Sequence, residues 1–283
     1  MFKHYLITRF NLKNKNWDVT KNNETLLTRE WMTHRIGLFS NFCLPSVASQ
    51  TNTDFQWLLF FDTTTDADFK TEIEALLKPY PHFKAFYIDG MDAFHSSIKS
   101  YITEDSKDSP YIITSRIDND DCIRKDYIAT IQQQFKSQDF MAIDILKGYS
   151  LQVSPDIMLG KKEHIFNPFI SLIEKNDTPK TVWFSDHNMW KKESRRVEIA
   201  NQRLWMSIIH EKNKVNEFDG YDNVSWDAIK TDFIVSDDIN AKVSKHIIPH
   251  KEWRYLSFKN KLYVNYVLMS KKLKKAVGLY KIK

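Results

Sequence analysis

The chain has 283 residues, of which 42% are hydrophobic and 27% charged, and its formal net charge is +5. This composition fits one large globular domain or two small ones and excludes a disordered chain, a coiled coil and a disulfide-rich secreted module. Only 6 glycines occur, and neither G-x-x-x-x-G-K nor G-x-G-x-x-G is present, which argues against P-loop NTPases and classical dinucleotide-binding folds.

Short apolar runs of strand length alternate with segments of helical pattern through the first half of the chain. The predicted strands are 4–10, 55–61, 83–88, 111–117 and 140–145, the predicted helices are 28–49, 66–77, 93–103 and 123–135, and 12–24 is a predicted polar loop. Such alternation is typical of an α/β fold with a mostly parallel sheet that helices cover on both faces. Ligands bind at the carboxyl ends of the strands in such sheets, so polar residues there are candidates for a site.

The second half of the chain is less regular. An apolar, strand-like run over 181–184 is followed by Asp186 and His187, with Trp183 and Trp190 nearby. The pattern predicts a helix over 201–210 that ends at His210, and a surface turn over 232–240.

The most informative stretch is Arg116-Ile117-Asp118-Asn119-Asp120-Asp121, which follows a predicted apolar strand directly. Three carboxylates so close together repel each other unless they are solvated or neutralised. A divalent cation neutralises them well, since Mg²⁺ and Mn²⁺ prefer oxygen ligands, and the D-x-D spacing lets Asp118 and Asp120 project the same way. The alternative is an acidic turn that caps a helix starting near Ile123.

This stretch belongs to an ordered set of residues. The set is Thr8-Arg9-Phe10-Asn11; Trp31, Arg35 and Leu38-Phe39; Cys43-Leu44-Pro45-Ser46-Val47 and Gln50; Phe55-x-Trp57-Leu58 and Phe61-Asp62-x-x-Thr65; and Thr114-x-Arg116-Ile117-Asp118-Asn119-Asp120-Asp121. It resembles the bacterial rhamnosyltransferase family of GT-A-fold glycosyltransferases over roughly residues 5–145. The resemblance implies a GT-A-like (Rossmann-type) α/β fold, a nucleotide-diphosphate sugar donor, Mn²⁺ or Mg²⁺ on the aspartates, and transfer to an acceptor hydroxyl.

The resemblance also implies roles for single residues. Thr8, Arg9, Asp62, Arg116 and Asp118 would bind the donor and its nucleotide. Asp120 and Asp121 would hold the metal on the diphosphate. For Arg116 an ion pair with its own acidic neighbours is an equally good reading, although guanidinium groups suit phosphates.

The remaining roles fall in the second half. An inverting transferase needs a base near the acceptor hydroxyl. Asp186 is the predicted base and His187 its substitute, with Trp183 and Trp190 as surfaces for sugar stacking; an Asx turn with a helix cap is the alternative for Asp186. His210 would be an extra metal or phosphate ligand, unless it only interacts with the dipole at the end of its helix.

The predicted organisation is therefore a nucleotide-sugar-binding half (1–145), an acceptor-side half of the same GT-A domain (146–250) and a basic amphipathic C-terminal segment (251–283). From Arg254 to Lys283 there are nine Lys or Arg and no Asp or Glu. As a helix, this segment could lie on an anionic membrane surface, or it could dock on the protein with a solvated basic face. Nucleic acid is not an expected partner, because the basic residues are terminal.

The sequence thus predicts a metal-assisted, inverting glycosyltransferase of bacterial surface polysaccharide synthesis, with a glycan or lipid-linked glycan as acceptor and rhamnose as the sugar that the family name suggests. The two cysteines, Cys43 and Cys122, form no C-x-x-C pair, and the N-terminus is too polar for a signal peptide. These features favour a cytoplasmic protein, at the inner face of the membrane if the C-terminal segment binds there. A metal-dependent phosphohydrolase or nuclease, and a non-catalytic glycan-binding protein, are the alternatives.

Overall fold

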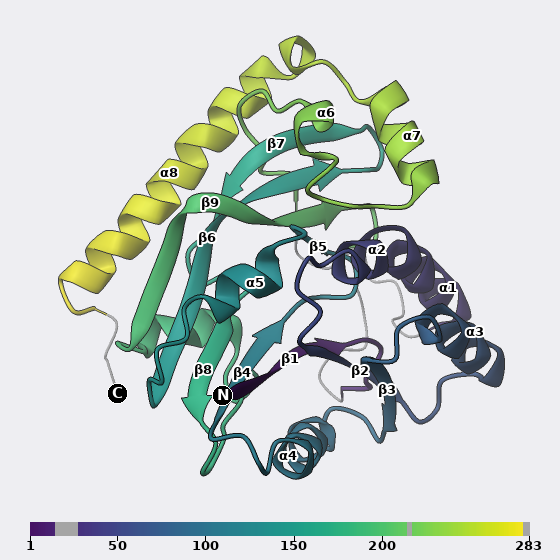
Figure 1. Cartoon of the computed structure of the whole chain (residues 1–283). Helices are drawn as coiled ribbons and strands as arrows, with labels where there is room; N and C mark the ends of the chain where they lie inside the picture. The colour runs from purple at the N-terminus through teal and green to yellow at the C-terminus, as the bar shows by residue number, and fades with distance from the viewer. Residues whose placement is uncertain (15–27, 214–216, 280–283) are drawn as a thin grey trace.

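The fold, seen in a computed structural model that describes residues 1–14, 28–213 and 217–279, is built on one curled nine-stranded sheet. Its strands are β1 (Phe2–Arg9), β2 (Gln56–Asp62), β3 (Phe83–Ile88), β4 (Tyr111–Arg116), β5 (Cys122–Ile123), β6 (Phe140–Gln152), β7 (Met158–Glu163), β8 (Ser171–Lys175) and β9 (Arg196–Ile209). Their order is β3-β2-β1-β4-β8-β6-β9-β5, with β7 paired to β6 (Figure 1).

The helical elements alternate with the strands in the first half and cluster at the end of the second. They are α1 (Arg29–Leu38), the π-helical turn η1 (Phe39–Cys43), α2 (Leu44–Ala48), α3 (Ala67–Leu77), α4 (Phe94–Asp105), α5 (Tyr127–Gln132), the 3₁₀ helix η2 (His187–Lys192), α6 (Trp226–Ile229), α7 (Asp237–His246), the 3₁₀ helix η3 (His250–Glu252) and α8 (Arg254–Ala276). The expected α/β class is therefore observed.

Strands β3, β2, β1 and β4 pair in parallel, as the alternation of strands and helices predicts. Beyond β4 the sheet is mixed, because β8 pairs antiparallel with β4 and β6 while β6 and β9 run parallel. Strand β6 crosses the boundary expected between residues 145 and 146, and the division into three regions remains a prediction.

Both faces of the parallel block are buried under helices. Side chains of successive residues in β2 point to opposite faces. Trp57, Leu59 and Phe61 pack with residues of α1, η1, α2 and α3, whereas Leu58 and Phe60 pack with residues of α4. This double burial explains why the strands of the first half are continuous apolar runs in the sequence.

Four sequence-based expectations are wrong in detail. Residues 201–209 lie in strand β9 and not in a helix. The sequence misled here because Leu204–Ile209 is buried on both faces and shows no alternation, and such a short apolar run fits a strand and a helix equally well. Residues 181–184 form turns and no strand. The helix expected over 123–135 is shorter and consists of α5 alone. The surface turn expected over 232–240 contains the start of α7, where Ser236 is the N-cap. Most of the predicted loop 12–24 is outside the described residues.

Candidate active site at the carboxyl ends of β1 and β4

The acidic segment lies where the sequence places it, directly after a strand of the parallel block. Strand β4 ends at Arg116, and its neighbour β1 ends at Arg9, so both arginines stand at the same edge of the sheet. Asn119, Asp120 and Asp121 are buried, and Asp118 is half-buried. The carboxyl ends of β1 and β4 therefore carry both cationic and anionic side chains, within one parallel block.

Asp120 is held between two cationic or ionisable side chains from distant parts of the chain. Oδ2 of Asp120 lies 2.5 Å from Nη1 of Arg35, in α1, and 3.1 Å from Nε2 of His210, which follows β9. Burial alone would raise the pKa of Asp120, but the charge of Arg35 and the hydrogen bond with His210 outweigh it and leave this pKa below its usual range. Asp120 is therefore an ionised carboxylate near neutral pH.

His210 has further partners that fix its ring. Its Nδ1 lies 3.3 Å from Nε2 of His34, and its Nε2 lies 3.1 Å from Nδ2 of Asn213. Burial, with the charges of His210, Lys212 and Arg35, lowers the pKa of His34 to about 4, so the His34 imidazole is neutral at pH 7. The ring of His210 therefore stands in a defined position beside Asp120, and not at the end of a helix as the sequence suggested.

Asp121 and Asp118 differ sharply in their surroundings. Oδ1 of Asp121 accepts a hydrogen bond of 3.0 Å from the backbone N–H of Ile208 in β9, and burial together with the charges of Asp120 and Asp118 raises the pKa of Asp121 well above its usual value. This carboxyl group attaches the acidic segment to β9. The carboxylate of Asp118 makes no ion pair or hydrogen bond within the described part of the chain, so it is available to a ligand.

The residues fit a divalent metal that takes part of its coordination from a substrate. Asp120 and His210 supply an oxygen and a nitrogen ligand that already meet, and the free carboxylate of Asp118 precedes them in the same segment. Asp121 does not fit, because its carboxyl group is turned inward onto β9. In the three described ranges no three His, Cys, Asp or Glu side chains gather as a complete metal site. Metal ions of the Mg²⁺ type commonly use one or two carboxylates together with phosphate oxygens, which is what this arrangement offers.

A second feature of the site is the buried guanidinium of Arg116, which lacks hydrogen-bond partners among the described residues. Arg116 is 4% exposed, and within residues 1–14, 28–213 and 217–279 its Nε and Nη1 atoms have no hydrogen-bond partner. Its guanidinium carbon lies 3.8 Å from the ring centroid of Trp183, and that of Arg9 lies 5.5 Å from the same ring. Within the described residues Arg116 makes no ion pair, so the alternative of pairing with its acidic neighbours is not observed.

The electrostatics of Arg116 connect two parts of the predicted site. Burial lowers the pKa of Arg116 to about 10; Arg9 adds to this effect, while the negative charges of Asp118 and Asp186 oppose it. Arg116 remains charged at neutral pH and lies within electrostatic range of both carboxylates. Asp186 itself is exposed and is the N-cap residue of η2, although its side chain makes no capping bond. The side chain of His187 lies outside the described part of the structure.

The two tryptophans near Asp186 are not open stacking surfaces. Trp190 is 1% exposed and packs with Phe140 and Phe184. Trp183 is 5% exposed, and a face of its ring is covered by Arg116. Both rings belong to the hydrophobic cluster beneath α4, so the sequence-based assignment of Trp183 and Trp190 to sugar stacking is wrong.

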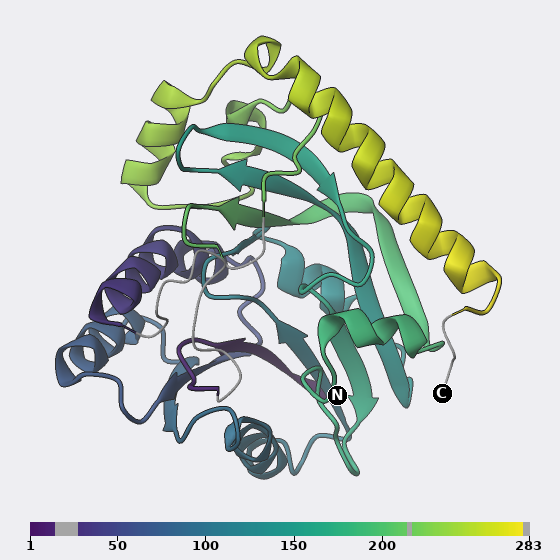
Figure 2. The same ribbon diagram turned by 180° about the vertical axis from the view of Figure 1, so that it is seen from behind.

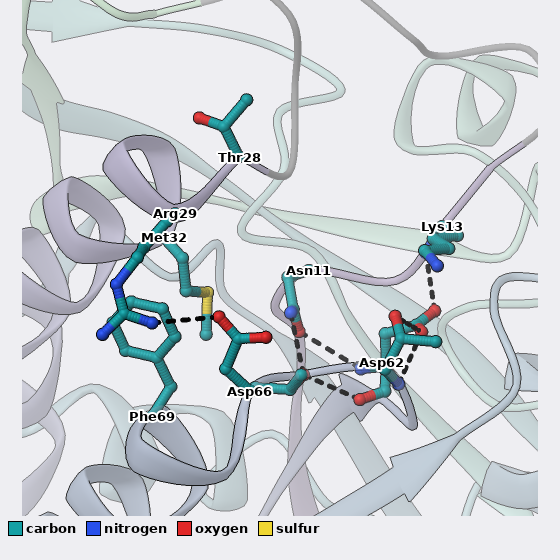
Figure 3. Close-up of a pocket in the computed structure, with 10 residues that line it drawn as sticks. Asn11, Lys13, Thr28, Arg29, Met32, Asp62, Asp66 and Phe69 are labelled. Atoms are coloured by element: carbon teal, nitrogen blue, oxygen red, sulfur yellow. Dashed lines mark hydrogen bonds and ion pairs between the residues drawn. The ribbon is translucent and has the colours of Figure 1, made fainter.

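Two residues expected at the nucleotide are engaged within the protein. Thr8 is fully buried, donates to the carbonyl of Ile117 and accepts from Nε1 of Trp57, so it joins β1 to its neighbours. Asp62 lines a cavity of about 60 Å³ with Asn11 and Lys13 (Figure 3). Its carboxylate already accepts hydrogen bonds from Thr64 and from the backbone of Lys13, which shape the turn after β2.

Sequence reasoning gave no role to Arg35, His34 or Asn213, although Arg35 is in the ordered set that carries the resemblance. No local pattern indicates that these side chains reach the acidic segment, since the contact depends on how α1 and the end of β9 are placed in three dimensions. Arg35 bridges two residues of that segment, because its Nη1 also donates to Oδ1 of Asn119 at 3.1 Å.

Comparisons with known proteins give one match of sequence and several distant matches of structure. Residues 3–220 match the family described as "Putative rhamnosyl transferase", whereas no curated protein matches the chain. S. aureus TarS 1–349 in complex with UDP-GlcNAc is 12% identical, with a TM-score of 0.43 and coverage of 75% of this chain and 60% of that chain. A putative nucleotide-diphospho-sugar transferase from Desulfovibrio desulfuricans G20 is 11% identical, with a TM-score of 0.33 and coverage of 63% and 64%.

This chain spans about 60% of the length of the TarS chain, and the structural matches are too distant to bear on the chemistry of its site. The family match, in contrast, is a match of sequence. It extends over most of the chain and includes the acidic segment, Arg35 and His210. The chain therefore belongs to the putative rhamnosyl transferase family.

Proposed function

We propose that the protein transfers a sugar, rhamnose by its family's description, from a nucleotide-diphosphate donor to a hydroxyl of a glycan in bacterial surface polysaccharide synthesis. The observation that carries this proposal is the pairing of two features at the ends of β1 and β4. One is the Asp120–His210 contact, and the other is the buried guanidinium of Arg116, whose Nε and Nη1 atoms have no hydrogen-bond partner in the described part of the chain. A metal with a diphosphate would satisfy both.

In this proposal the donor lies between the two features. Arg116 and Arg9 bind the diphosphate, since guanidinium groups form paired hydrogen bonds with phosphate oxygens. Asp118 accepts hydrogen bonds from the ribose or the donor sugar. Thr8, Asp62 and Asp121 act as positioning residues, because their polar atoms hold β1, the turn after β2, and β9.

Asp120 and His210 would hold Mn²⁺ or Mg²⁺. When bound, such an ion neutralises the charge that develops on the leaving diphosphate. In the absence of such an ion, the guanidinium of Arg35 neutralises the charge of Asp120.

The transfer itself needs a base for the acceptor hydroxyl. We assign this role to Asp186, with His187 as the substitute. The carboxylate takes the proton of the hydroxyl as its oxygen forms a bond to the anomeric carbon, and the bond from that carbon to the diphosphate oxygen breaks. Attack opposite the leaving group inverts the anomeric centre and releases a nucleoside diphosphate. The acceptor is a glycan or a lipid-linked glycan, and the reaction takes place on the cytoplasmic side of the membrane.

Thermal unfolding in the presence of nucleotides tests the proposal. The protein is heated with UDP, GDP or dTDP, and with CMP as the control nucleotide, each with and without Mn²⁺. We expect one diphosphate to stabilise the protein in a metal-dependent manner, by about 2.7 kcal/mol at one hundred times its dissociation constant. No stabilisation by any diphosphate would contradict the proposal.

Two variants separate the two features of the site. Asp120→Ala should abolish the metal-dependent part of the stabilisation, whereas Arg116→Lys should weaken nucleotide binding both with and without metal. The matched control is Asp156→Ala, since Asp156 is an exposed carboxylate in a loop between β6 and β7. Each variant is compared with its own ligand-free melting temperature, so that a loss of stability is not mistaken for a loss of binding.

A further inference from the structure

Helix α8 carries an apolar stripe on the side that faces away from the protein. The stripe consists of Tyr255, Phe258, Leu262, Tyr266, Met269 and Leu273, each between 56% and 83% exposed. Its members are three or four residues apart, so they share one face of the helix. The opposite face contains the buried residues Ser257, Asn260 and Val264. The stripe is therefore the outermost side of α8 and not a poorly packed part of the core.

Polar contacts fix this orientation along the length of the helix. Nδ2 of Asn260 donates to the carbonyl groups of Phe218 and Gly220, and Nζ of Lys261 lies 2.8 Å from Asp222. Further along, Nζ of Lys271 donates to the carbonyl of Ile165 at 3.0 Å. Figures 1 and 2 both show α8 along the outer edge of the molecule, against the second half of the sheet. Rotation that buried the stripe would break these contacts.

Basic side chains flank the apolar stripe on both sides. Helix α8 contains seven Lys or Arg and no Asp or Glu: Arg254, Lys259, Lys261, Lys271, Lys272, Lys274 and Lys275. At about 100° per residue, Lys259 and Lys274 lie on one side of the stripe and Lys261 and Lys272 on the other. Of these seven basic residues, only Lys261 and Lys275 form ion pairs with described residues. Lys261 pairs with Asp222, and Lys275 pairs with Glu198. Most of the positive charge beside the stripe is thus available to an external anion.

We propose that α8 lies in the head-group region of a bilayer that contains anionic lipids, with the stripe facing the acyl chains and the flanking lysines near lipid phosphates. The chemistry of the stripe fits this surface, because Tyr rings have an apolar body and a polar end, and lysine stems extend toward head groups. An open hollow beside the stripe adds apolar surface. It is lined by Leu268, Met269, Leu273 and Ala276, together with Asn265 and the flanking Lys272.

The charge pattern argues against the other occupants. If two copies packed stripe against stripe, their lysine rows would face each other without any acidic residue of α8 to compensate. A membrane-spanning role also fails for this helix, since no helix in the described ranges is long and apolar enough to cross a bilayer. The proposal does not depend on the proposed function, because it uses only α8 and its neighbours.

Co-sedimentation of the full chain with vesicles tests the proposal. Vesicles of phosphatidylcholine are compared with vesicles that also contain phosphatidylglycerol, at low and high salt. We expect the protein to sediment with the anionic vesicles and to be released by salt. The variant Lys259→Gln/Lys272→Gln/Lys274→Gln should reduce partitioning by about a hundredfold, since each lysine contributes about fivefold at an anionic surface. The variant Leu262→Gln/Tyr266→Gln/Met269→Gln should reduce it comparably.

The matched control is Lys242→Gln/Lys245→Gln on α7, where two exposed lysines are removed from a helix without an exposed apolar stripe. This control should bind vesicles almost as the unmodified chain does. The substituted side chains are exposed, so circular dichroism and melting temperature should not change. The proposal is overturned if the chain stays in the supernatant with anionic vesicles, or if the two lysine variants are equally impaired. Sedimentation velocity that shows a dimer lost only in the stripe variant, without vesicle binding, would assign the surface to a second copy instead.

Discussion

Oδ2 of Asp120 and Nε2 of His210 are 3.1 Å apart, although 90 residues separate them in the sequence. The short strand β5 explains this contact. It pairs antiparallel with β9, so that Cys122 lies opposite Met206 and Ile123 opposite Trp205. If this register continues toward lower residue numbers before β5, it runs toward higher residue numbers in β9. The acidic segment before β5 therefore lies alongside the C-terminal end of β9. The hydrogen bond from Ile208 to Asp121 belongs to the same arrangement.

The first prediction concerns His210→Ala. Removing the imidazole takes away one of two proposed protein ligands, so we expect the affinity for Mn²⁺ in the presence of nucleoside diphosphate to fall by roughly tenfold or more. Titration calorimetry with Mn²⁺ measures this directly. The control is His246→Ala, at the exposed end of α7. Equal metal affinity in the two variants would remove His210 from the metal site.

The second prediction concerns Asp186→Asn, which keeps the size of the side chain but cannot accept the proton of an acceptor hydroxyl. We expect kcat, measured as release of nucleoside diphosphate, to fall by about 10²- to 10⁴-fold, with the nucleotide dissociation constant unchanged. Asp177→Asn, on an exposed turn after β8, serves as control. If kcat falls in His187→Ala but not in Asp186→Asn, the base is the substitute residue.

The third prediction concerns the pairing of β6 with β9, which supports the site. Gly148 lies opposite Trp205 in this pair, and a Cβ at position 148 would lie 2.2 Å from a ring atom of that tryptophan. The ring has little room to move, because it stacks on Phe169 at 4.9 Å and its Nε1 donates to the carbonyl of Ile145. Gly148→Ala should therefore lower the free energy of unfolding by about 1–3 kcal/mol.

The same chain offers a control with the opposite sign. Gly37 lies within α1, and a Cβ there would meet nothing within 4 Å. Gly37→Ala should raise the free energy of unfolding by roughly 0.5–1 kcal/mol, because alanine loses less backbone entropy in a helix. Denaturation with guanidinium chloride measures both values. A Gly148→Ala protein as stable as the unmodified chain would mean that β6 and β9 do not pack as described.

The first half of the fold follows from local signals, and the second half does not. Runs such as 55–61 are apolar, short and followed by turn residues, so strand and helix could be told apart there. In β9 the apolar run Leu204–Ile209 is buried on both faces and has no alternation, so the same reasoning predicted a helix. What decides the matter is pairing with β6, a contact between segments far apart in the sequence.

The candidate site shows the same division. The acidic segment and Arg116 could be found from the sequence, because unusual residue types follow a strand directly. Arg35 and the neutral His34 could not, since a helix presents polar residues on several sides and only packing decides which of them reach Asp120. Trp190 could not be assigned either, because an aromatic residue beside a polar turn reads equally well as a stacking surface and as part of the core.

The last prediction concerns the pH dependence of stability and the buried Asp144 of β6. Burial raises the pKa of Asp144 to about 6, although the hydrogen bond from Phe166 and the charge of Arg196 oppose this shift. In the unfolded chain an aspartate has a pKa of about 3.9. Between these two pH values the carboxyl group of Asp144 keeps its proton in the folded state and loses it in the unfolded state. The contribution of Asp144 to stability is therefore fully present below about pH 4 and is lost as the pH rises through about 6.

Asp144→Asn isolates this contribution, since the amide has nearly the same shape and does not titrate. From pH 4 to pH 7 the unmodified chain should lose about 3 kcal/mol of unfolding free energy relative to Asp144→Asn. This value corresponds to about 1.4 kcal/mol for each unit by which the pKa of Asp144 is raised in the folded state. Other buried carboxyl groups, such as Glu174, titrate in both proteins and cancel in the difference. Urea denaturation at several pH values measures it, and a difference that stays constant over this range would show that Asp144 has the same pKa in the folded and unfolded chain.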